Sequence, residues 1–147
     1  MPEPAHFTIS TDPARLDVAL IHEYLSNHSY WAPGIGRELV ERSIRHSLCF
    51  GLYAPDGRQA GFARIISDRA TFAYLCDVFV LEEFRGQGLS KLLMQHISQH
   101  PELQGLRRWM LGTRDAHSLY AQYGFTPLAA PARFMENAKL DPYRQPQ

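Results

Sequence analysis

Hydrophobic and polar residues follow two different periods along this chain, and the order of these periods predicts the fold. Residues 47–54, 59–67 and 71–81 are apolar runs rich in β-branched and aromatic side chains, which predict three strands. Proline, aspartate and glycine stand between the first two runs, which predicts a hairpin turn. Because the third run is apolar almost throughout, we expect it at the centre of a sheet.

Other segments carry helical spacing or helix boundaries instead. Residues 88–100 place three leucines and an isoleucine at i, i+3, i+4 and i+8, the spacing of a helix packed on a sheet. Residues 37–46 predict a second helix with the same periodicity. Asp12 followed by Pro13 is typical of a helix start, and Asp115 is a candidate cap for a further short helix.

Three shorter stretches complete the order of elements. Residues 7–10, 108–112 and 127–135 are predicted as strands, the last of them interrupted by prolines. The order is strand, two helices, three antiparallel strands, helix, strand, helix, strand. It predicts a mixed α/β sheet that is mostly antiparallel and flanked by helices. Because we find no repeat, no low-complexity segment and no linker, residues 1–147 are predicted to form a single domain.

Composition narrows the partners and the compartment. The 15 basic residues balance the 15 acidic ones, so net charge gives no reason to expect nucleic acid or an anionic membrane as partner. No apolar run reaches the length of a membrane span, and the first residues lack the pattern of a secretory signal, which favours the cytoplasm. The histidines and cysteines show no metal-ligand spacing, so we expect no metal. Cys49 and Cys76 are expected as free buried thiols, with a disulfide between adjacent strands as the alternative.

The most informative motif is a turn with two glycines between the central strand and the long helix. The first N–H groups of a helix have no partner within it, and the helix dipole adds partial positive charge there. Gly86 and Gly88 tolerate positive φ and let a ligand approach the main chain, while Arg85 adds a permanent charge. A pyrophosphate suits such a site. The P-loop pattern is absent because Leu89 follows the last glycine, and the dinucleotide fingerprint is absent because Lys91 replaces its third glycine.

Two motifs in this region resemble the GCN5-related N-acetyltransferase (GNAT) family. The turn reads Arg85-x-x-Gly88-x-Ser90, which is similar to the family's coenzyme A signature except that Ser90 replaces a glycine or alanine. Residues 119–125 match the family's L-Y-x-x-x-G-F motif position for position. The resemblance implies the acyl-CoA N-acyltransferase fold, in which two central strands splay apart and acetyl-CoA enters the gap. It also implies acceptor-side helices (1–46), an acetyl-CoA-binding core (47–125) and a C-terminal strand and tail (126–147).

The resemblance implies roles for individual residues. Tyr120 stands where the family has its general acid, and a phenol with a pKa of about 10 is protonated at neutral pH and can donate to a departing thiolate. Asp115 stands where the family often has an asparagine on the pantetheine arm, with helix capping as the alternative. The main chain of Phe79 and Val80, next to Val78, is expected to hold the pantetheine arm and the acetyl group, and the turn is expected to hold the pyrophosphate. The residues concerned are Val78, Phe79 and Val80, then Arg85, Gly86, Gln87, Gly88, Leu89 and Ser90.

The residue that takes the proton from the amine is left open by the sequence. Family members that act on polyamines often carry Glu-Asp where this chain reads Cys76-Asp77. Regular strand alternation places Asp77 on the face opposite to Cys76. Asp77 is either a catalytic proton relay or a structural hydrogen-bonding residue, and the favoured route is water aided by Asp77, His28 or Glu23. A thiol with a pKa of about 8.5 is a poor base, and an acyl-Cys76 intermediate is the remaining alternative.

Two aromatic residues stand in the loop that should face the acceptor. Tyr30 and Trp31 either anchor the core or form the wall of an amine pocket, where cation–π contact favours an ammonium, with Arg64 as a polar contributor. The sequence thus predicts an acetyl-CoA-dependent N-acetyltransferase that acts on a small primary amine by direct attack in a ternary complex. The alternatives are a protein amine as acceptor, a non-catalytic acyl-CoA-binding module and a nucleotide-binding protein. The resemblance also implies a homodimer as a candidate assembly.

Overall fold

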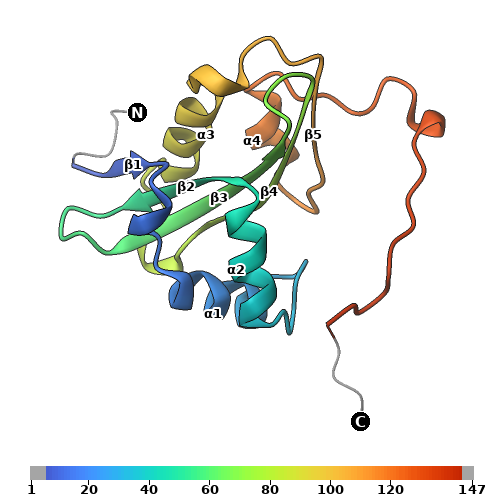
Figure 1. Ribbon diagram of the computed structural model, residues 1–147. Helices are drawn as coiled ribbons and strands as arrows, with labels where there is room; N and C mark the ends of the chain where they lie inside the picture. Colours follow the sequence, from blue (N-terminus) through green and yellow to red (C-terminus); the bar gives the residue numbers. More distant parts are fainter. Residues whose placement is uncertain (1–5, 144–147) are drawn as a thin grey trace.

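Five strands form one sheet in the computed structural model, which describes residues 6–143 (Figure 1). Neighbouring strands follow the order of the chain from β1 to β5. The first four run antiparallel, while β5 lies parallel to β4. The predicted mixed, mostly antiparallel sheet is therefore confirmed. The strands are β1 (Thr8–Ser10), β2 (Leu48–Tyr53), β3 (Gln59–Ser67), β4 (Phe72–Val80) and β5 (Arg108–Leu111).

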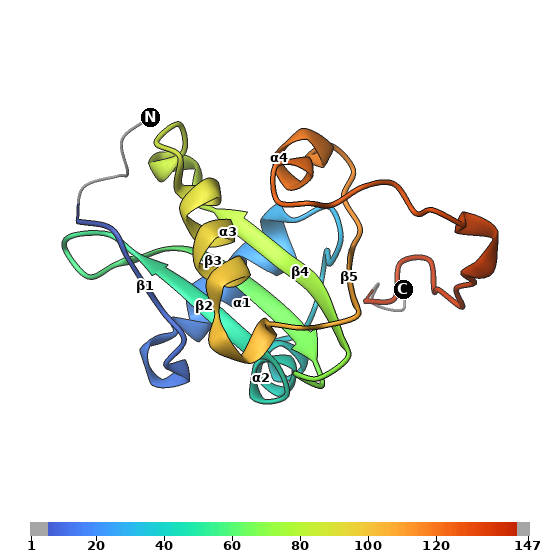
Figure 2. The ribbon, with the colours of Figure 1, turned by 90° about the horizontal axis from the view of Figure 1, so that it is seen from above.

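Helices cover both faces of this sheet, as the view from above shows (Figure 2). The first face carries α1 (Val18–His28) and α2 (Arg37–Arg45). The second carries α3 (Leu89–Gln99) and the short α4 (His117–Ala121). Within residues 6–143, no helix combines the length and the apolar character that a membrane span requires.

Each face of the sheet buries its own cluster of apolar side chains. Leu93 and Ile97 of α3 pack with Ile65 and other residues on one face of the strands. Ile21 of α1 packs with Phe62 on the opposite face. A fully buried side chain of this size contributes about 1.5–3 kcal/mol relative to an exposed one. The two clusters hold the helices on the sheet and fix the register of its central strands, because a slip by one residue would exchange the two faces.

β4 carries a bulge at Asp77. Phe62 of β3 pairs with Phe79, but Arg64 pairs with Cys76, so one residue of β3 lies opposite two residues of β4. Asp77 has a φ of 53°, which lies in the left-handed region that aspartate and asparagine adopt more readily than most residues. The extra residue shifts the alternation of side chains in the second half of the strand.

This shift corrects the expected orientation of Asp77. Leu75 packs in the cluster under α3 and Phe79 in the cluster under α1 and α2, although residues four apart share a face in a regular strand. Cys76 is the cross-strand partner of Arg64, and the carboxylate of Asp77 contacts the same arginine. Cys76 and Asp77 therefore lie on one face, toward α1 and α2. The prediction of opposite faces is wrong because it assumed a strand without a bulge.

β4 and β5 separate after a short paired stretch. Pairing runs from Phe72 with Arg108 to Leu75 with Leu111, while β4 continues to Val80. The two strands diverge beyond this point (Figure 2). The edge of β4 over residues 76–80 consequently has no strand beside it on the β5 side.

Two predicted elements differ from the structure. Asp12 caps only a short 3-10 turn, and α1 begins after Asp17, whose carboxylate accepts the N–H of Leu20 at 3.1 Å. Residues 127–135 form no strand and contain a single 3-10 turn. Pro127 and Pro131 lack the N–H that a strand donates to its neighbour, which explains the difference.

Candidate active site

A cavity of about 470 Å³ lies where β4 and β5 separate. Its walls come from the bulged part of β4, the loop that follows β5, the loop between α1 and α2, and Tyr120 of α4. Three stretches far apart in the sequence therefore meet at one place, since the loop after β5 continues directly into α4. The residues that line it are Tyr30, Trp31, Tyr74, Leu75, Cys76, Asp77, Val78, Leu111, Gly112, Thr113, Arg114, Asp115, Ala116 and Tyr120.

The open edge of β4 offers main-chain groups to this gap. The N–H of Leu81 donates to the carbonyl of Ala60 on the β3 side at 2.8 Å, so by strand alternation Phe79 also faces β3. A Cβ placed on Gly61 would lie 2.8 Å from the carbonyl oxygen of Phe79, in agreement with this direction. The groups that face the gap thus belong to Val78 and Val80. The expected contact between the Phe79 main chain and the pantetheine arm is therefore wrong. The carbonyl of Phe79 faces β3, and its side chain packs in the cluster under α1 and α2.

The turn between β4 and α3 has the conformation that the glycines predicted. Gly86 and Gly88 have φ values of 84° and 77°, and Gly88 caps α3 without a side-chain hydrogen bond. Leu92 donates the first N–H of the helix, to the carbonyl of Gly88 at 3.1 Å, so the N–H groups of residues 89–91 have no partner in the helix. A Cβ on Gly86 would meet no atom within 4 Å. The turn therefore presents open main chain to an approaching anion, and pyrophosphate binding by its residues, Ser90 included, stays a prediction.

The side chain of Arg85 turns away from the helix start. Its Nε donates to the carbonyl of Val80 at 2.9 Å, and its Nη2 donates to the hydroxyl of Tyr24 in α1 at 3.1 Å. These two contacts hold the turn against β4 and α1. The amide of Gln87 donates to the carbonyl of Phe84 at 3.1 Å and closes the turn from within. A direct contact between the Arg85 guanidinium and a phosphate stays a prediction.

Tyr120 is buried at the inner end of the cavity. Burial raises the pKa of its phenol from 10.0 to about 12, with a smaller effect from the nearby Tyr30. The hydroxyl is therefore protonated at neutral pH and suited to donate. The rest of the motif fixes its place: Phe125 packs edge-on against Tyr120, and Tyr123 donates to the carbonyl of Lys91 in α3 at 3.1 Å. Tyr123 therefore has a structural role, whereas Tyr120 lines the cavity.

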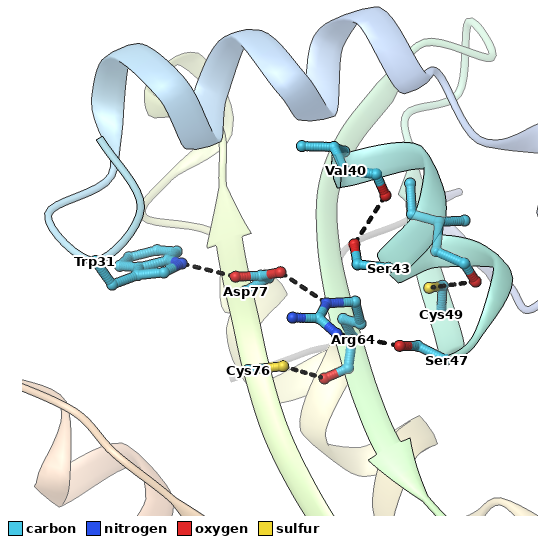
Figure 3. A network of polar contacts seen from close by, with 9 residues as sticks. Trp31, Val40, Ser43, Ser47, Cys49, Arg64, Cys76 and Asp77 are labelled. Carbon is cyan, nitrogen blue, oxygen red and sulfur yellow. Dashed lines mark hydrogen bonds and ion pairs between the residues drawn. The ribbon is translucent and has the colours of Figure 1, made fainter. Parts of the chain in front are cut away.

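Asp77 is the centre of a network of polar contacts (Figure 3). One carboxylate oxygen accepts the indole N–H of Trp31 at 2.8 Å, and the other accepts Nε–H of Arg64 at 2.8 Å. Arg64 in turn donates to the hydroxyl of Ser47 at 3.1 Å. The side chains of Arg64 and Asp77 are only 16% and 10% exposed. Because both oxygens already accept hydrogen bonds, the structure favours the positioning role of Asp77 over the role of proton relay.

Cys76 lies beside this network and is protonated. Burial raises the pKa of its thiol from 9.0 to about 12, and the S–H donates toward the carbonyl of Arg64 at 3.5 Å. A neutral thiol is neither a base nor a strong nucleophile, which weighs against an acyl-Cys76 intermediate. Cys49 lies on the other side of Arg64 in β2, and both thiols are free, as predicted.

The loop after β5 has a different construction from the one predicted. Ala116, not Asp115, is the N-cap residue of α4, and its N–H donates to the hydroxyl of Thr113 at 3.1 Å. Asp115 is exposed and pairs with Arg114 at 3.3 Å. The capping role of Asp115 is therefore wrong, because the helix begins one residue later than the pattern indicated. Its contact with pantetheine stays a prediction.

Arg114 and Tyr74 line the cavity without having been predicted. The main-chain N–H of Arg114 donates to the hydroxyl of Tyr30 at 2.8 Å, and its guanidinium lies 4.1 Å from the centre of the Tyr30 ring. Tyr74 precedes Cys76 by two residues, so strand alternation could have placed both on one face. Among the described residues, no group of three or more His, Cys, Asp or Glu side chains is arranged to hold a metal ion.

Comparison with known proteins agrees with this geometry. The family model of the acetyltransferase (GNAT) domain matches residues 45–127, more than half of the chain. The chain belongs to the GNAT family of acetyltransferases. The match spans β2 to α4, and so includes the central strand, the glycine turn and Tyr120.

Comparison with individual proteins extends the match beyond residues 45–127. A crystal structure of a GNAT-family protein from Xanthomonas campestris is 55% identical, with a TM-score of 0.95 over 98% of this chain and 100% of that one. An acetyltransferase-like protein of Gibberella zeae is 34% identical over 79% of this chain and 76% of its own length. A Staphylococcus aureus protein is 24% identical over 91% and 99% of the two chains, with a TM-score of 0.70, and at this identity shows the fold alone.

Proposed function

We propose that this GNAT protein transfers the acetyl group of acetyl-CoA to a primary amine of a small molecule, by direct attack in a ternary complex. The observation that carries the proposal is the meeting of three features at one gap. These are the open edge of β4, the glycine turn at the start of α3, and the protonated phenol of Tyr120. Each matches one part of an acetyl-thioester of a pyrophosphate-bearing cofactor.

The residues around the gap fit acetyl-CoA as a substrate. Main-chain groups of Val78 and the N–H of Val80 face the gap, while the Val80 carbonyl is bound by Arg85. These groups suit an extended, amide-containing arm, which can pair with an open strand edge as another strand would. The free N–H groups of residues 89–91 and the open main chain at Gly86 suit a pyrophosphate. These contacts hold the thioester beside Tyr120, inside the cavity.

The proposed reaction has a balanced set of transfers. The nitrogen lone pair attacks the thioester carbonyl carbon, and the new C–N bond forms as negative charge develops on the carbonyl oxygen. Main-chain N–H groups on the open edge of β4 stabilise that charge. The C–S bond then breaks, and the thiolate takes the phenolic proton of Tyr120. The amine releases its proton to water, and solvent restores the proton of Tyr120.

Thiol release measures this function directly. Purified protein is incubated with acetyl-CoA and a panel of small amines, amino acids, aminoglycosides and lysine peptides, and free CoA is quantified. Turnover with a small amine above the rate without acceptor supports the proposal. Turnover with lysine peptides alone would indicate a protein amine as the acceptor in place of a small molecule. Acetyl-CoA binding with no turnover would favour the non-catalytic module, and the absence of both would refute the proposal.

A matched pair of variants tests the role of the phenol. Tyr120→Phe removes the hydroxyl from the cavity, whereas Tyr123→Phe removes one that bonds to Lys91 outside it. We expect Tyr120→Phe to lower kcat by about 100-fold, the scale of general acid catalysis, with acetyl-CoA affinity unchanged. Tyr123→Phe should leave kcat near that of the native protein. Equal kcat for the two variants would exclude Tyr120 as the acid.

A further inference from the structure

The exposed aromatic side chains of the protein gather around the cavity between β4 and β5. Among residues 6–143, three aromatic residues count among the large hydrophobic side chains that remain exposed: Tyr30 at 44%, Trp31 at 37% and Tyr74 at 36%. All three line this cavity. Exposed aromatic rings that cluster in one concave site indicate a binding surface, whereas exposed apolar residues scattered singly need no explanation.

The rings of Tyr30 and Trp31 are held in place before any ligand arrives. Their centroids lie 5.0 Å apart at an interplanar angle of 84°. Trp31 donates its indole N–H to Asp77 on β4, and Tyr30 accepts the N–H of Arg114 after β5. The loop between α1 and α2 is thereby tied to β4 and to the loop that follows β5. A wall that is already ordered binds a flat ring at little cost in side-chain entropy.

The charged groups of the same cavity are paired with one another. Asp77 is bound to Arg64, and Asp115 is bound to Arg114. An ammonium that entered in addition to the reacting amine would find each carboxylate already matched by a guanidinium. Buried beside Asp77, it would have a desolvation cost without a free carboxylate, whereas the exposed Asp115–Arg114 pair has little weight in either direction. The cavity therefore disfavours polyamines and other substrates with a charged body.

From these contacts we infer that the acceptor is an arylalkylamine, a primary amine carried by a flat and uncharged aromatic group. The inference rests on the proposed function and names the substrate class for that site. Flat rings stack on or pack edge-on against the side chains of Tyr30, Trp31 and Tyr74, which saturated rings of the same size do less well.

An arylalkylamine also suits a cavity in which neither Asp77 nor Cys76 is available as a general base. Both oxygens of Asp77 accept hydrogen bonds, and the thiol of Cys76 is protonated. An apolar, charge-balanced surrounding itself favours the neutral form of a bound amine, because burial disfavours its ammonium. The neutral form is the one with a lone pair to attack the thioester. Acetylation then depends on the basicity of the acceptor and not on a carboxylate of the protein.

Steady-state kinetics on the full chain with three matched amines test the inference. 2-Phenylethylamine carries a flat ring, 2-cyclohexylethylamine a saturated ring of similar size, and spermidine a charged chain. We expect kcat/KM for the aromatic amine to exceed that of the saturated one by about fivefold, the scale of an aromatic contact. It should exceed that of spermidine by about 100-fold, the scale of an unpaired buried charge.

Variants connect this preference to the rings. Tyr74→Leu removes a ring that stands outside the Trp31–Asp77–Arg64 network, so the variant should keep its fold. We expect its kcat/KM values for 2-phenylethylamine and 2-cyclohexylethylamine to be similar. Leu39→Ala, at an exposed position of α2 that does not line the cavity, is the control that should keep the preference. Turnover of spermidine equal to or above the aromatic amine would overturn the inference and leave the proposed function standing. Absence of turnover with every amine would overturn both.

Discussion

The contact between Asp77 and Arg64 allows the sharpest test of how β4 is built. Asp77→Asn keeps the left-handed backbone, which asparagine also tolerates, and keeps an oxygen for the indole of Trp31. It replaces the charge that Arg64 pairs with by a neutral amide. Breaking a buried pair on one side costs about 3–5 kcal/mol. Because both side chains retain some exposure, we expect a loss at the lower end, about 3 kcal/mol of unfolding free energy.

Asp77→Ala should lower the free energy of unfolding further than Asp77→Asn does. It also removes the hydrogen bond from Trp31, about 1 kcal/mol. In addition, alanine in the left-handed region costs about 1–2 kcal/mol. The sum is a loss of about 5 kcal/mol, and the difference between the two variants isolates the bulge and the indole contact from the ion pair.

Urea unfolding followed by circular dichroism measures both losses. With a slope of about 2 kcal/mol/M, Asp77→Asn should lower the midpoint by about 1.5 M. A double variant with Arg64→Met should recover part of that loss, because no unpaired guanidinium is left. A midpoint shift for Asp77→Asn below about 0.5 M would contradict the contribution of the ion pair. Equal shifts for Asn and Ala would contradict the contributions of the left-handed backbone and the Trp31 contact.

Three further predictions concern the glycine turn, a buried hydroxyl and the thiols. Gly86→Val should weaken acetyl-CoA binding by about tenfold or more, because a branched residue resists the φ of 84° that the turn adopts. Calorimetric titration measures the affinity, with Gly105→Val as the control. Tyr53→Phe should raise the melting temperature, because it removes a buried hydroxyl with no hydrogen-bond partner among the described residues, and a lower melting temperature would show that the hydroxyl is bonded. Burial raises the pKa of Cys49 and of Cys76 from 9.0 to about 12, so their contribution to stability is complete below pH 9 and is lost as pH rises toward 12. Urea unfolding across that interval should show a decline that is shallower in Cys49→Ala, and an unchanged slope would contradict it.

Much of the fold could be predicted from local pattern. The hairpin of β2 and β3, the long α3 and the apolar β4 each follow from periods of two or 3.6 residues, which depend on neighbours close in sequence. The glycine turn could be predicted for the same reason, since positive φ at Gly86 and Gly88 is a property of those residues. Tyr120 was predicted through the resemblance of its motif, and the cavity agrees with its position.

The differences arise where distant segments decide the outcome. The bulge at Asp77 depends on the register of β3 against β4, which no local pattern reports. Asp115 is a residue type typical of a helix cap, but α4 begins after Ala116, whose N–H donates to the hydroxyl of Thr113, and the Asp115 carboxylate pairs with Arg114 instead. The strand expected over residues 127–135 requires N–H groups that its prolines do not have.

The sequence by itself determined most of the elements and the glycine turn, because each depends on a short run of residues and its intrinsic conformational preferences. Only the tertiary structure decided which side chains share the cavity. The bulge brings Asp77 to the face of Cys76 and Arg64, and the loop between α1 and α2 brings Trp31 to Asp77. These hydrogen bonds join residues 13 and 46 positions apart, so they depend on the pairing and packing of the sheet and not on any single segment.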